Sequence, residues 1–149
     1  MNISVLKTLR RIFVLILVLS LTMPSYVSAA TIETAQPYAS NYLTSYNTYI
    51  CDMGSGNIQI WFHVMGTGDM DEIGALSIRL YESTDNTNWT HVKTYLHEDY
   101  SSMLVEDDFY HSSHVSYQGV AGRYYKAYVC IWAGKNGSGD TRYMWARMA

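Results

Sequence analysis

Apolar and polar residues alternate along most of the chain after residue 40. In four runs apolar residues share alternate positions of the chain: Ile58, Ile60, Phe62 and Val64; Leu76, Ile78 and Leu80; Val92 and Leu96, with Thr94 between them; and Tyr125, Ala127, Val129 and Ile131. A period of two is typical of a strand that buries one of its faces. No window in this part has the three- and four-residue spacing of an amphipathic helix. We therefore expect an all-β fold whose core is built from these residues.

Short polar stretches separate the alternating runs and define the expected turns. Residues 85–88 and 134–140 are rich in Asn, Asp and Gly, which tolerate positive φ and favour hairpins. Strands are then expected at 41–52, 57–66, 74–83, 89–97, 112–118, 122–133 and 141–148. Seven strands at this spacing are typical of an antiparallel β-sandwich.

The first thirty residues have a different pattern. Lys7, Arg10 and Arg11 precede an apolar run from Ile12 to Leu21, and small residues follow at 27–30. A basic start, a short apolar centre and small residues at the cleavage position indicate a secretory signal peptide, cleaved after residue 29 or 30. We predict a signal-peptide helix at 1–29, a flexible arm at 30–40 and one β-sandwich domain at 41–149.

The net charge of the chain after signal cleavage limits the classes of molecule that it is expected to bind. Removing Lys7, Arg10 and Arg11 leaves seven Lys and Arg against 13 Asp and Glu, a net charge of −6. An acidic chain is a poor partner for nucleic acid, whose binding depends on clustered cations. No lipid-attachment cysteine and no second long apolar segment follow the signal, so we expect a secreted protein without stable membrane insertion after cleavage.

Several segments carry resemblances to known proteins. The run from Gly119 to Val129 resembles the sixth strand of immunoglobulin-like and fibronectin type III sandwiches, which makes Tyr125 a candidate for their tyrosine corner. Residues 70–74, 83–89, 117–122 and 133–137 together resemble an uncharacterised family, a domain of unknown function, of small exported proteins from Gram-positive bacteria. That resemblance implies a compartment and a bacterial host, and it implies no activity.

Cys51 and Cys130 are the two cysteines of the chain. An even number in an exported protein favours a disulfide, which would close a loop of about 80 residues and stabilise the fold by roughly 4 kcal/mol. However, Cys130 alternates with the apolar residues of its strand, so a bridge through the core is not implied. The alternative is two free thiols.

Motifs for catalysis or metal binding are weak. The sequence has no nucleophile elbow and no phosphate-binding loop, so we expect a non-enzymatic protein without a cofactor. The spacing of His111 and His114 would suit zinc on a helix, but in a strand the two side chains point to opposite faces. Asp69-x-Asp71 begins like a calcium loop, yet Ile73 and Leu80 stand where oxygen ligands are required. We therefore predict no metal site.

Ser83-x-Asp85-x-x-x-Trp89 resembles the Asp-box turn of sialidase-like propellers, in which an aspartate caps the turn and a tryptophan packs beneath it. The match is one residue short and lacks the glycine. Even the complete motif is a folding device, so we expect a capped turn here and no active site.

The strongest candidate for function is the outer face of the sheet. If the apolar residues point inward, the residues between them point outward and combine aromatic rings with cations. The predicted ligand-binding residues are Arg79, Trp89, Lys93, Tyr95, Lys126, Tyr128 and Trp132, with Tyr143, Trp145 and Arg147 extending the face. Such surfaces stack on sugars or bind polyanions. Cross-strand aromatic pairs that only protect the sheet are the structural alternative.

Two functions follow from this sequence. The first is a secreted, non-enzymatic module that binds an extracellular glycan or cell-wall polymer through the aromatic and basic face. The alternative is an extracellular protein-interaction, effector or assembly protein without a small-molecule ligand. Exposed rings would favour the first, whereas an unpaired strand edge would favour the second.

Overall fold

The structure is a computed structural model that describes residues 40–148. They form six strands and a short 3-10 helix: β1 (Leu43–Asp52), β2 (Asn57–Ser83), β3 (Thr90–Leu96), η1 (Ser101–Met103), β4 (Leu104–Gln118), β5 (Tyr124–Lys135) and β6 (Ser138–Arg147). The predicted signal peptide, nearly all of the predicted arm at 30–40 and Ala149 lie outside the described residues. Within residues 40–148, no helix is long and apolar enough to cross a bilayer.

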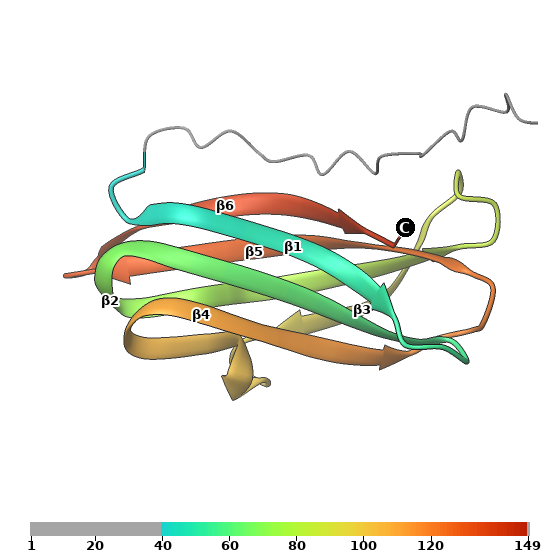
Figure 1. Cartoon of the computed structure of the whole chain (residues 1–149). Coiled ribbons are helices and arrows are strands. Elements are labelled where there is room, and N and C mark those ends of the chain that lie inside the picture. Colours follow the sequence, from blue (N-terminus) through green and yellow to red (C-terminus); the bar gives the residue numbers. More distant parts are fainter. Residues whose placement is uncertain (1–39, 149) are drawn as a thin grey trace, which may run out of the picture. The chain divides into compact units, whose positions relative to one another are not determined.

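All strand pairs of this sheet are antiparallel, which confirms the all-β antiparallel prediction. The number of strands differs, because the strands predicted at 57–66 and 74–83 are one 27-residue strand, β2. β2 bends at residues 66–69. These four residues lie opposite the single residue Phe109 of β4, between the pairs Met65–Tyr110 and Met70–Asp108. Since β4 bends together with β2, pairing continues on both sides of the bend (Figure 1).

The bend divides the sheet into two halves that share β2. The first half-sheet contains β1, residues 57–65 of β2 and residues 110–118 of β4. The second half-sheet contains β3, residues 72–83 of β2, residues 104–106 of β4, β5 and β6. An isolated parallel bridge joins Ile50 of β1 to Met148, the residue that follows β6. The sheet therefore curls, with its open side between β3 and β4.

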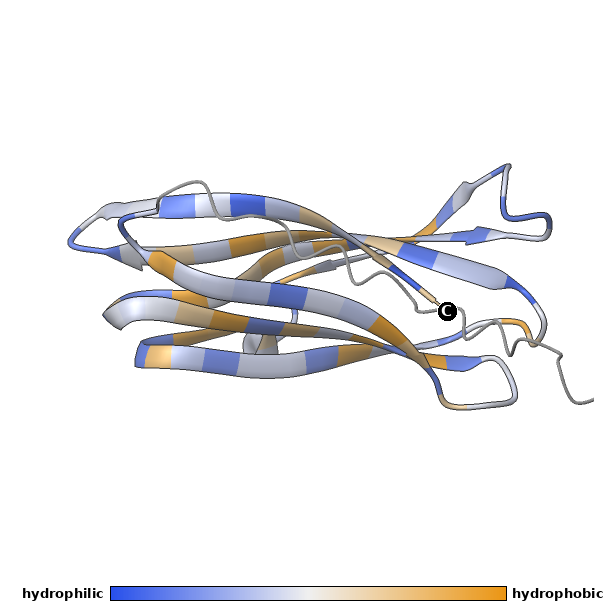
Figure 2. Cartoon of the chain, turned by 45° about the horizontal axis from the view of Figure 1, so that its top comes forward, coloured by the Kyte–Doolittle hydropathy of each residue, from blue (hydrophilic) through white to orange (hydrophobic). Residues whose placement is uncertain are grey.

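The core lies inside this curl and follows the alternation of the sequence. Phe62, Ile78, Val129 and Ile131 are fully buried, as predicted, and orange and blue bands alternate along the strands in Figure 2. Three predicted core residues are exceptions: Leu76 and Val92 are half-buried and Leu96 is 40% exposed, while their neighbours Ala75 and Tyr95 are buried. These departures lie at two shifts in register, one at Leu76 in the pairing of β2 with β5 and one at Val92 in the pairing of β3 with β2.

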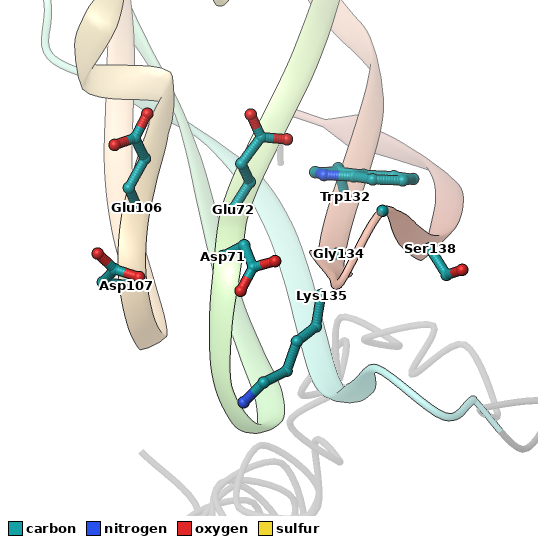
Figure 3. A pocket seen from close by; sticks show the side chains of 9 residues that line it. Asp71, Glu72, Glu106, Asp107, Trp132, Gly134, Lys135 and Ser138 are labelled. Atoms are coloured by element: carbon teal, nitrogen blue, oxygen red, sulfur yellow. The ribbon is translucent and has the colours of Figure 1, made fainter.

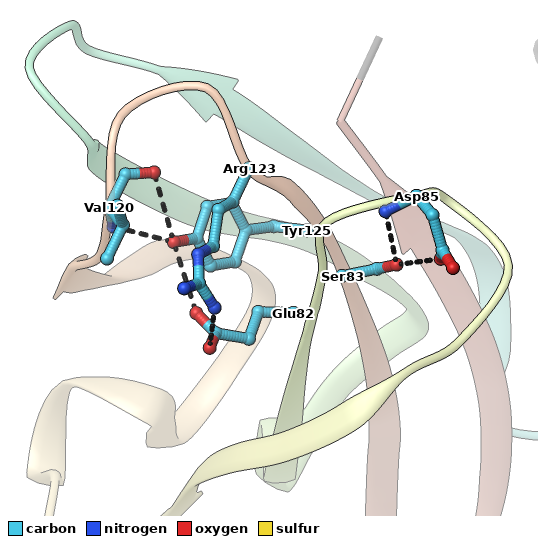
Figure 4. Close-up of polar contacts among 6 residues, drawn as sticks. All are labelled: Glu82, Ser83, Asp85, Val120, Arg123 and Tyr125. Carbon is cyan, nitrogen blue, oxygen red and sulfur yellow. Dashed lines mark hydrogen bonds and ion pairs between the residues drawn. The ribbon is translucent and has the colours of Figure 1, made fainter.

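The two ends of β5 correspond to two features that the sequence predicted, a hairpin turn and a tyrosine corner. The predicted loop at 134–140 is shorter than expected, because β5 and β6 meet in a two-residue turn in which Asn136 and Gly137 both have positive φ. At the other end of β5, the hydroxyl of Tyr125 accepts a hydrogen bond of 2.7 Å from the backbone N–H of Val120. This is the backbone contact expected of a tyrosine corner (Figure 4).

Candidate functional site

Cross-strand register brings rings and cations together on the outside of the second half-sheet. Arg79 of β2 lies opposite Tyr128 of β5, and Tyr128 lies opposite Trp145 of β6. The next row places Lys126 between Tyr81 and Arg147. We call this surface the aromatic-basic face; it consists of Arg79, Tyr81, Trp89, Lys126, Tyr128, Tyr143, Trp145 and Arg147.

Lys126 is the centre of the aromatic-basic face. Its Nζ lies 4.3 Å from the ring centre of Trp89, 4.8 Å from that of Trp145 and 5.9 Å from that of Tyr81. Rings at these distances attract a cation through their negative faces. Partial burial and then the neighbouring charge of Arg147 lower the pKa of Lys126 below its ordinary value.

The turn at Asp85 holds Trp89 in position. Asp85 Oδ1 accepts hydrogen bonds from the backbone N–H groups of Thr87 at 2.9 Å and Asn88 at 2.8 Å. The bonds from Asn88 and Thr87 hold the pKa of this carboxyl well below its usual range. Ser83 closes the turn with a 2.9 Å hydrogen bond to Asp85 (Figure 4). The predicted capped turn is confirmed, and its tryptophan contacts Lys126.

Tyrosines and a tryptophan fill the neighbouring part of the face. Tyr128 and Tyr143 stack at 5.5 Å with an interplanar angle of 11°, and Tyr128 lies 4.8 Å from Trp145. Because Tyr128 packs between these two rings, most of its own surface is covered. Tyr143 and Trp145 remain accessible, with 60% and 48% of their surface exposed.

Lys93 and Tyr95 do not lie on this face, contrary to the sequence prediction. The pairing of β3 with β2 shifts between Tyr81–His91 and Leu80–Lys93, so Val92 has no partner of its own. A one-residue bulge reverses the face of every residue that follows it. Tyr95 therefore lies opposite the buried residue Ile78, and Lys93 Nζ lies 5.6 Å from the Tyr95 ring.

Trp132 lies on the predicted side of β5 but not among the cations. A Cβ atom added at Gly134 or Gly139 would lie 2.6 or 2.4 Å from the indole ring, so the ring occupies the space above these two glycines. Its Nε1 is buried and has no hydrogen-bond partner among the described residues. Trp132 is therefore a packing residue at the far end of the half-sheet.

Next to Trp132 is an acidic groove of about 510 Å³ (Figure 3). Asp71, Glu72, Glu106 and Asp107 line it together with Trp132 and Lys135. Asp71 is partly engaged, because its Oδ2 accepts a 2.6 Å hydrogen bond from the backbone N–H of Asn136. In the part of the chain that the structure describes, no group of three or more His, Cys, Asp or Glu is placed to hold a metal ion.

His111 and His114 point to opposite faces of β4, as the sequence predicted. His111 packs against the buried ring of Phe62 and approaches the carbonyl oxygen of Ser102 at 2.8 Å. His114 stacks instead on Trp61 of the outer face, with ring centres 4.3 Å apart. The two imidazoles therefore do not converge on one point.

The two cysteines are free thiols on different strands. Cys51 lies half-buried on β1, whereas Cys130 is buried on β5 between Ser77 and Tyr143. Burial raises the pKa of the Cys130 thiol. Of the two alternatives that the sequence left open, the structure contains the unbridged one.

Sequence reasoning missed a second group of rings, on the outside of the first half-sheet. Tyr49, Trp61 and His114 form one cross-strand row in which Tyr49 and Trp61 are nearly parallel, at 7° and 6.3 Å. His63 adjoins this row: Tyr49 Oη is 3.0 Å from its Nε2 and Ser112 Oγ is 2.8 Å from its Nδ1. Trp61 and His63 alternate with the core residues of β2, which is the signal that would have identified them.

No protein-family model matches the chain, and no curated protein matches it. Among solved structures, the chain is similar to the sporulation control protein Spo0M from Bacillus subtilis, with 10% sequence identity and a TM-score of 0.37. The match covers 70% of this chain and 49% of the other, so the chain spans about half of that protein. A similarity of this size carries no argument about function.

Proposed function

We propose that this protein is an exported, non-enzymatic module that binds an acidic extracellular polymer, such as an acidic glycan or an anionic cell-wall polymer, on the aromatic-basic face. Tyr143 and Trp145 would stack on the sugar or the chain of the polymer. Arg79, Lys126 and Arg147 would hold its acidic groups. The free surface of the two rings and the charge of the three cations support this assignment.

The observation that carries the proposal is the pairing of Lys126 with Arg147. These residues lie directly opposite one another on neighbouring strands, where like charges are destabilising. The ion pairs of the described region involve other cations, namely Arg123, Arg142 and His97. Two adjacent cations without a carboxylate partner form a site that an anionic ligand would stabilise.

The accessible rings determine where the polymer would lie. Trp145 and Tyr143 stand on the same side of β6 as Arg147, two and four residues before it. A stacked ring typically contributes a large share of binding energy when a ligand covers it. We therefore place the sugar or backbone units over Tyr143 and Trp145 of β6 and the acidic groups beside them, over Lys126 and Arg147.

Retention on purified cell walls and on immobilised acidic polysaccharide tests the proposal. Trp145→Ala and Arg147→Met should each weaken retention by about tenfold or more, as expected for loss of a ligand contact worth about 1.4 kcal/mol. Added salt should weaken the wild type only partly, because the ring contact is not screened.

Two matched variants serve as controls in this assay. Tyr49→Ala removes an exposed ring from the other half-sheet, and Arg142→Met removes a cation of β6 that is near Asp140. Both should retain the polymer as the wild type does. Equal retention by all four variants, or no retention of the wild type on any acidic polymer, would contradict the proposal.

Export and the finer fold class belong to the same proposal. We infer that residues 1–29 direct secretion and that the fold is related to immunoglobulin and fibronectin type III sandwiches. The contact between Tyr125 and Val120 supports the relationship. N-terminal sequencing of the protein from a culture supernatant tests export: a chain that begins at residue 30 or 31 supports cleavage, and one that begins at Met1 contradicts it.

A further inference from the structure

Among the described residues, the open side of the curled sheet has two edges without a further strand, one on β3 and one on β4. β3 is short, contains the bulge at Val92 and carries the exposed Lys93. Bulges and lysines of this kind are the usual protection of a strand edge against further pairing. β4 has no such protection between Phe109 and Gln118, a stretch without Asp, Glu, Lys, Arg or Pro.

Hydrogen bonds identify which backbone groups of β4 face outward. The N–H of Gly119 points toward β2, where it donates to the carbonyl oxygen of Gly56 at 2.9 Å. The carbonyl of Ser116 points the other way and accepts a 2.8 Å hydrogen bond from the Tyr95 hydroxyl. Successive residues of a strand direct their backbone groups to opposite sides. The N–H and C=O groups of Ser112 and His114 therefore lie on the free edge.

These edge groups have no strand partner within residues 40–148, where β4 pairs with β2 alone. An edge that presents a row of unpaired donors and acceptors is a template for another strand. We propose that the edge of β4 pairs antiparallel with the same edge of a second copy of this chain, about a two-fold axis at Ser113.

The sequence of the edge supports a second copy as the occupant. With the axis at Ser113, Ser112 lies opposite His114 of the other copy, and each such pair exchanges two N–H···O=C hydrogen bonds. A charged strand would face its own charges in a two-fold contact, which is unfavourable. The stretch from Phe109 to Gln118 contains no such charge, although the chain as a whole is acidic.

Self-pairing would also extend the second group of rings. The row formed by Tyr49, Trp61 and His114 ends at β4, the edge strand of the first half-sheet. A second copy would continue this half-sheet across the axis. His114, the last residue of the row in one copy, would then lie opposite Ser112 of the other copy, next to that copy's own His114. The aromatic-basic face belongs to the other half-sheet, so this proposal does not depend on the proposed function.

Sedimentation equilibrium of the protein produced from the full-length coding sequence tests the pairing. The wild type should sediment as a concentration-dependent dimer. Ser112→Lys places a like charge on each side of the axis and should raise the dimer Kd by about tenfold or more. Asn47→Lys, which adds the same charge to β1 two strands from the edge, should leave the dimer Kd unchanged.

Amide hydrogen exchange provides a second readout that does not depend on a variant folding. The amides of Ser112 and His114 should become protected as the protein concentration rises, because only pairing with another copy depends on concentration. A wild type that stays monomeric, or a dimer that Ser112→Lys leaves intact with native circular dichroism, would overturn the proposal. Protection at every concentration would assign the edge to a segment of the same chain, and protection only with another protein would assign it to a different partner.

Discussion

The ammonium of Lys126 lies 4.3 Å from the centre of the Trp89 ring, although the two residues are 37 positions apart in the sequence. The Asp85 turn brings Trp89 to this place, and register brings Trp145 to the other side of the same ammonium. The aromatic-basic face is therefore organised by a turn and by strand pairing together.

Loss of the Lys126 charge should destabilise the fold modestly. We expect Lys126→Met to lower the free energy of unfolding by about 0.5–1 kcal/mol, because cation–π contacts with three rings, at about 0.5 kcal/mol or more each, outweigh the repulsion from Arg147 that the variant relieves. Lys93→Met removes the same charge but lies near a single ring, at 5.6 Å, and is the matched control. Urea unfolding measures both, and equal stabilities of the two variants would contradict a stabilising role of the three rings.

Trp132 should be required for stability and not for binding. Trp132→Ala should lower the free energy of unfolding by about 2 kcal/mol or more, because it leaves a cavity over Gly134 and Gly139. Trp145→Ala removes a ring of the same kind that is 48% exposed, so it should lower the free energy of unfolding by less, about 1 kcal/mol, through lost contacts with Tyr128 and Lys126. Thermal unfolding of the two variants makes the comparison, and a neutral Trp132→Ala would show that its ring does not pack.

Gly74 has no room for a side chain. It has φ +151°, and a Cβ there would lie 2.2 Å from the carbonyl oxygen of Met103. Because β2 is paired at Gly74 with both β4 and β5, the backbone cannot shift to relieve the contact. We expect Gly74→Ala to cost about 3 kcal/mol or more. Gly68→Ala, where a Cβ meets nothing within 4 Å, should be nearly neutral, and similar denaturation midpoints would refute this account.

Tyr95 should make stability depend on pH in the alkaline range. Burial raises the pKa of Tyr95 to about 12 from its ordinary value of 10.0. As pH rises from 10 to 12, the unfolded chain releases the Tyr95 proton while the folded chain keeps it, so the contribution of Tyr95 to stability is lost over that range.

Tyr95→Phe tests this dependence. At pH 7 it should cost about 1 kcal/mol through loss of the hydrogen bond to Ser116. The difference between variant and wild type should narrow above pH 10 in urea unfolding. The exposed Tyr124, as Tyr124→Phe, is the control. A difference that stays constant to pH 12 would mean that Tyr95 keeps its ordinary pKa in the fold.

Much of the local structure follows from the sequence because it depends on neighbours in the chain. Alternation predicted that Phe62, Ile78, Val129 and Ile131 are buried, since a strand with one apolar face has a single favourable orientation. The Asp85 turn is closed by hydrogen bonds among its own residues, since the Asp85 carboxylate accepts from Ser83, Thr87 and Asn88. On regular strands, alternation then gave the face on which each side chain lies, which is why Arg79, Lys126 and Tyr128 were correctly placed on one face.

Tertiary contacts decided the remaining features. The residues around Val92 contain no sequence signal for a bulge. The bulge forms because β3 shifts by one residue in its pairing with β2, which leaves Val92 without a partner. The continuity of β2 through its bend depends on β4, a strand that lies 40 residues further along the chain. The position of Trp132 depends on two glycines whose open space exists only after β5 and β6 pair. Sequence alone determined the central part of each strand and which face of a regular strand is apolar, because those properties are local; it did not give residues 67–73 of β2 or 104–111 of β4. Bulges, bends and the grouping of side chains from different strands required the assembled sheet, because pairing energy between distant segments selects them.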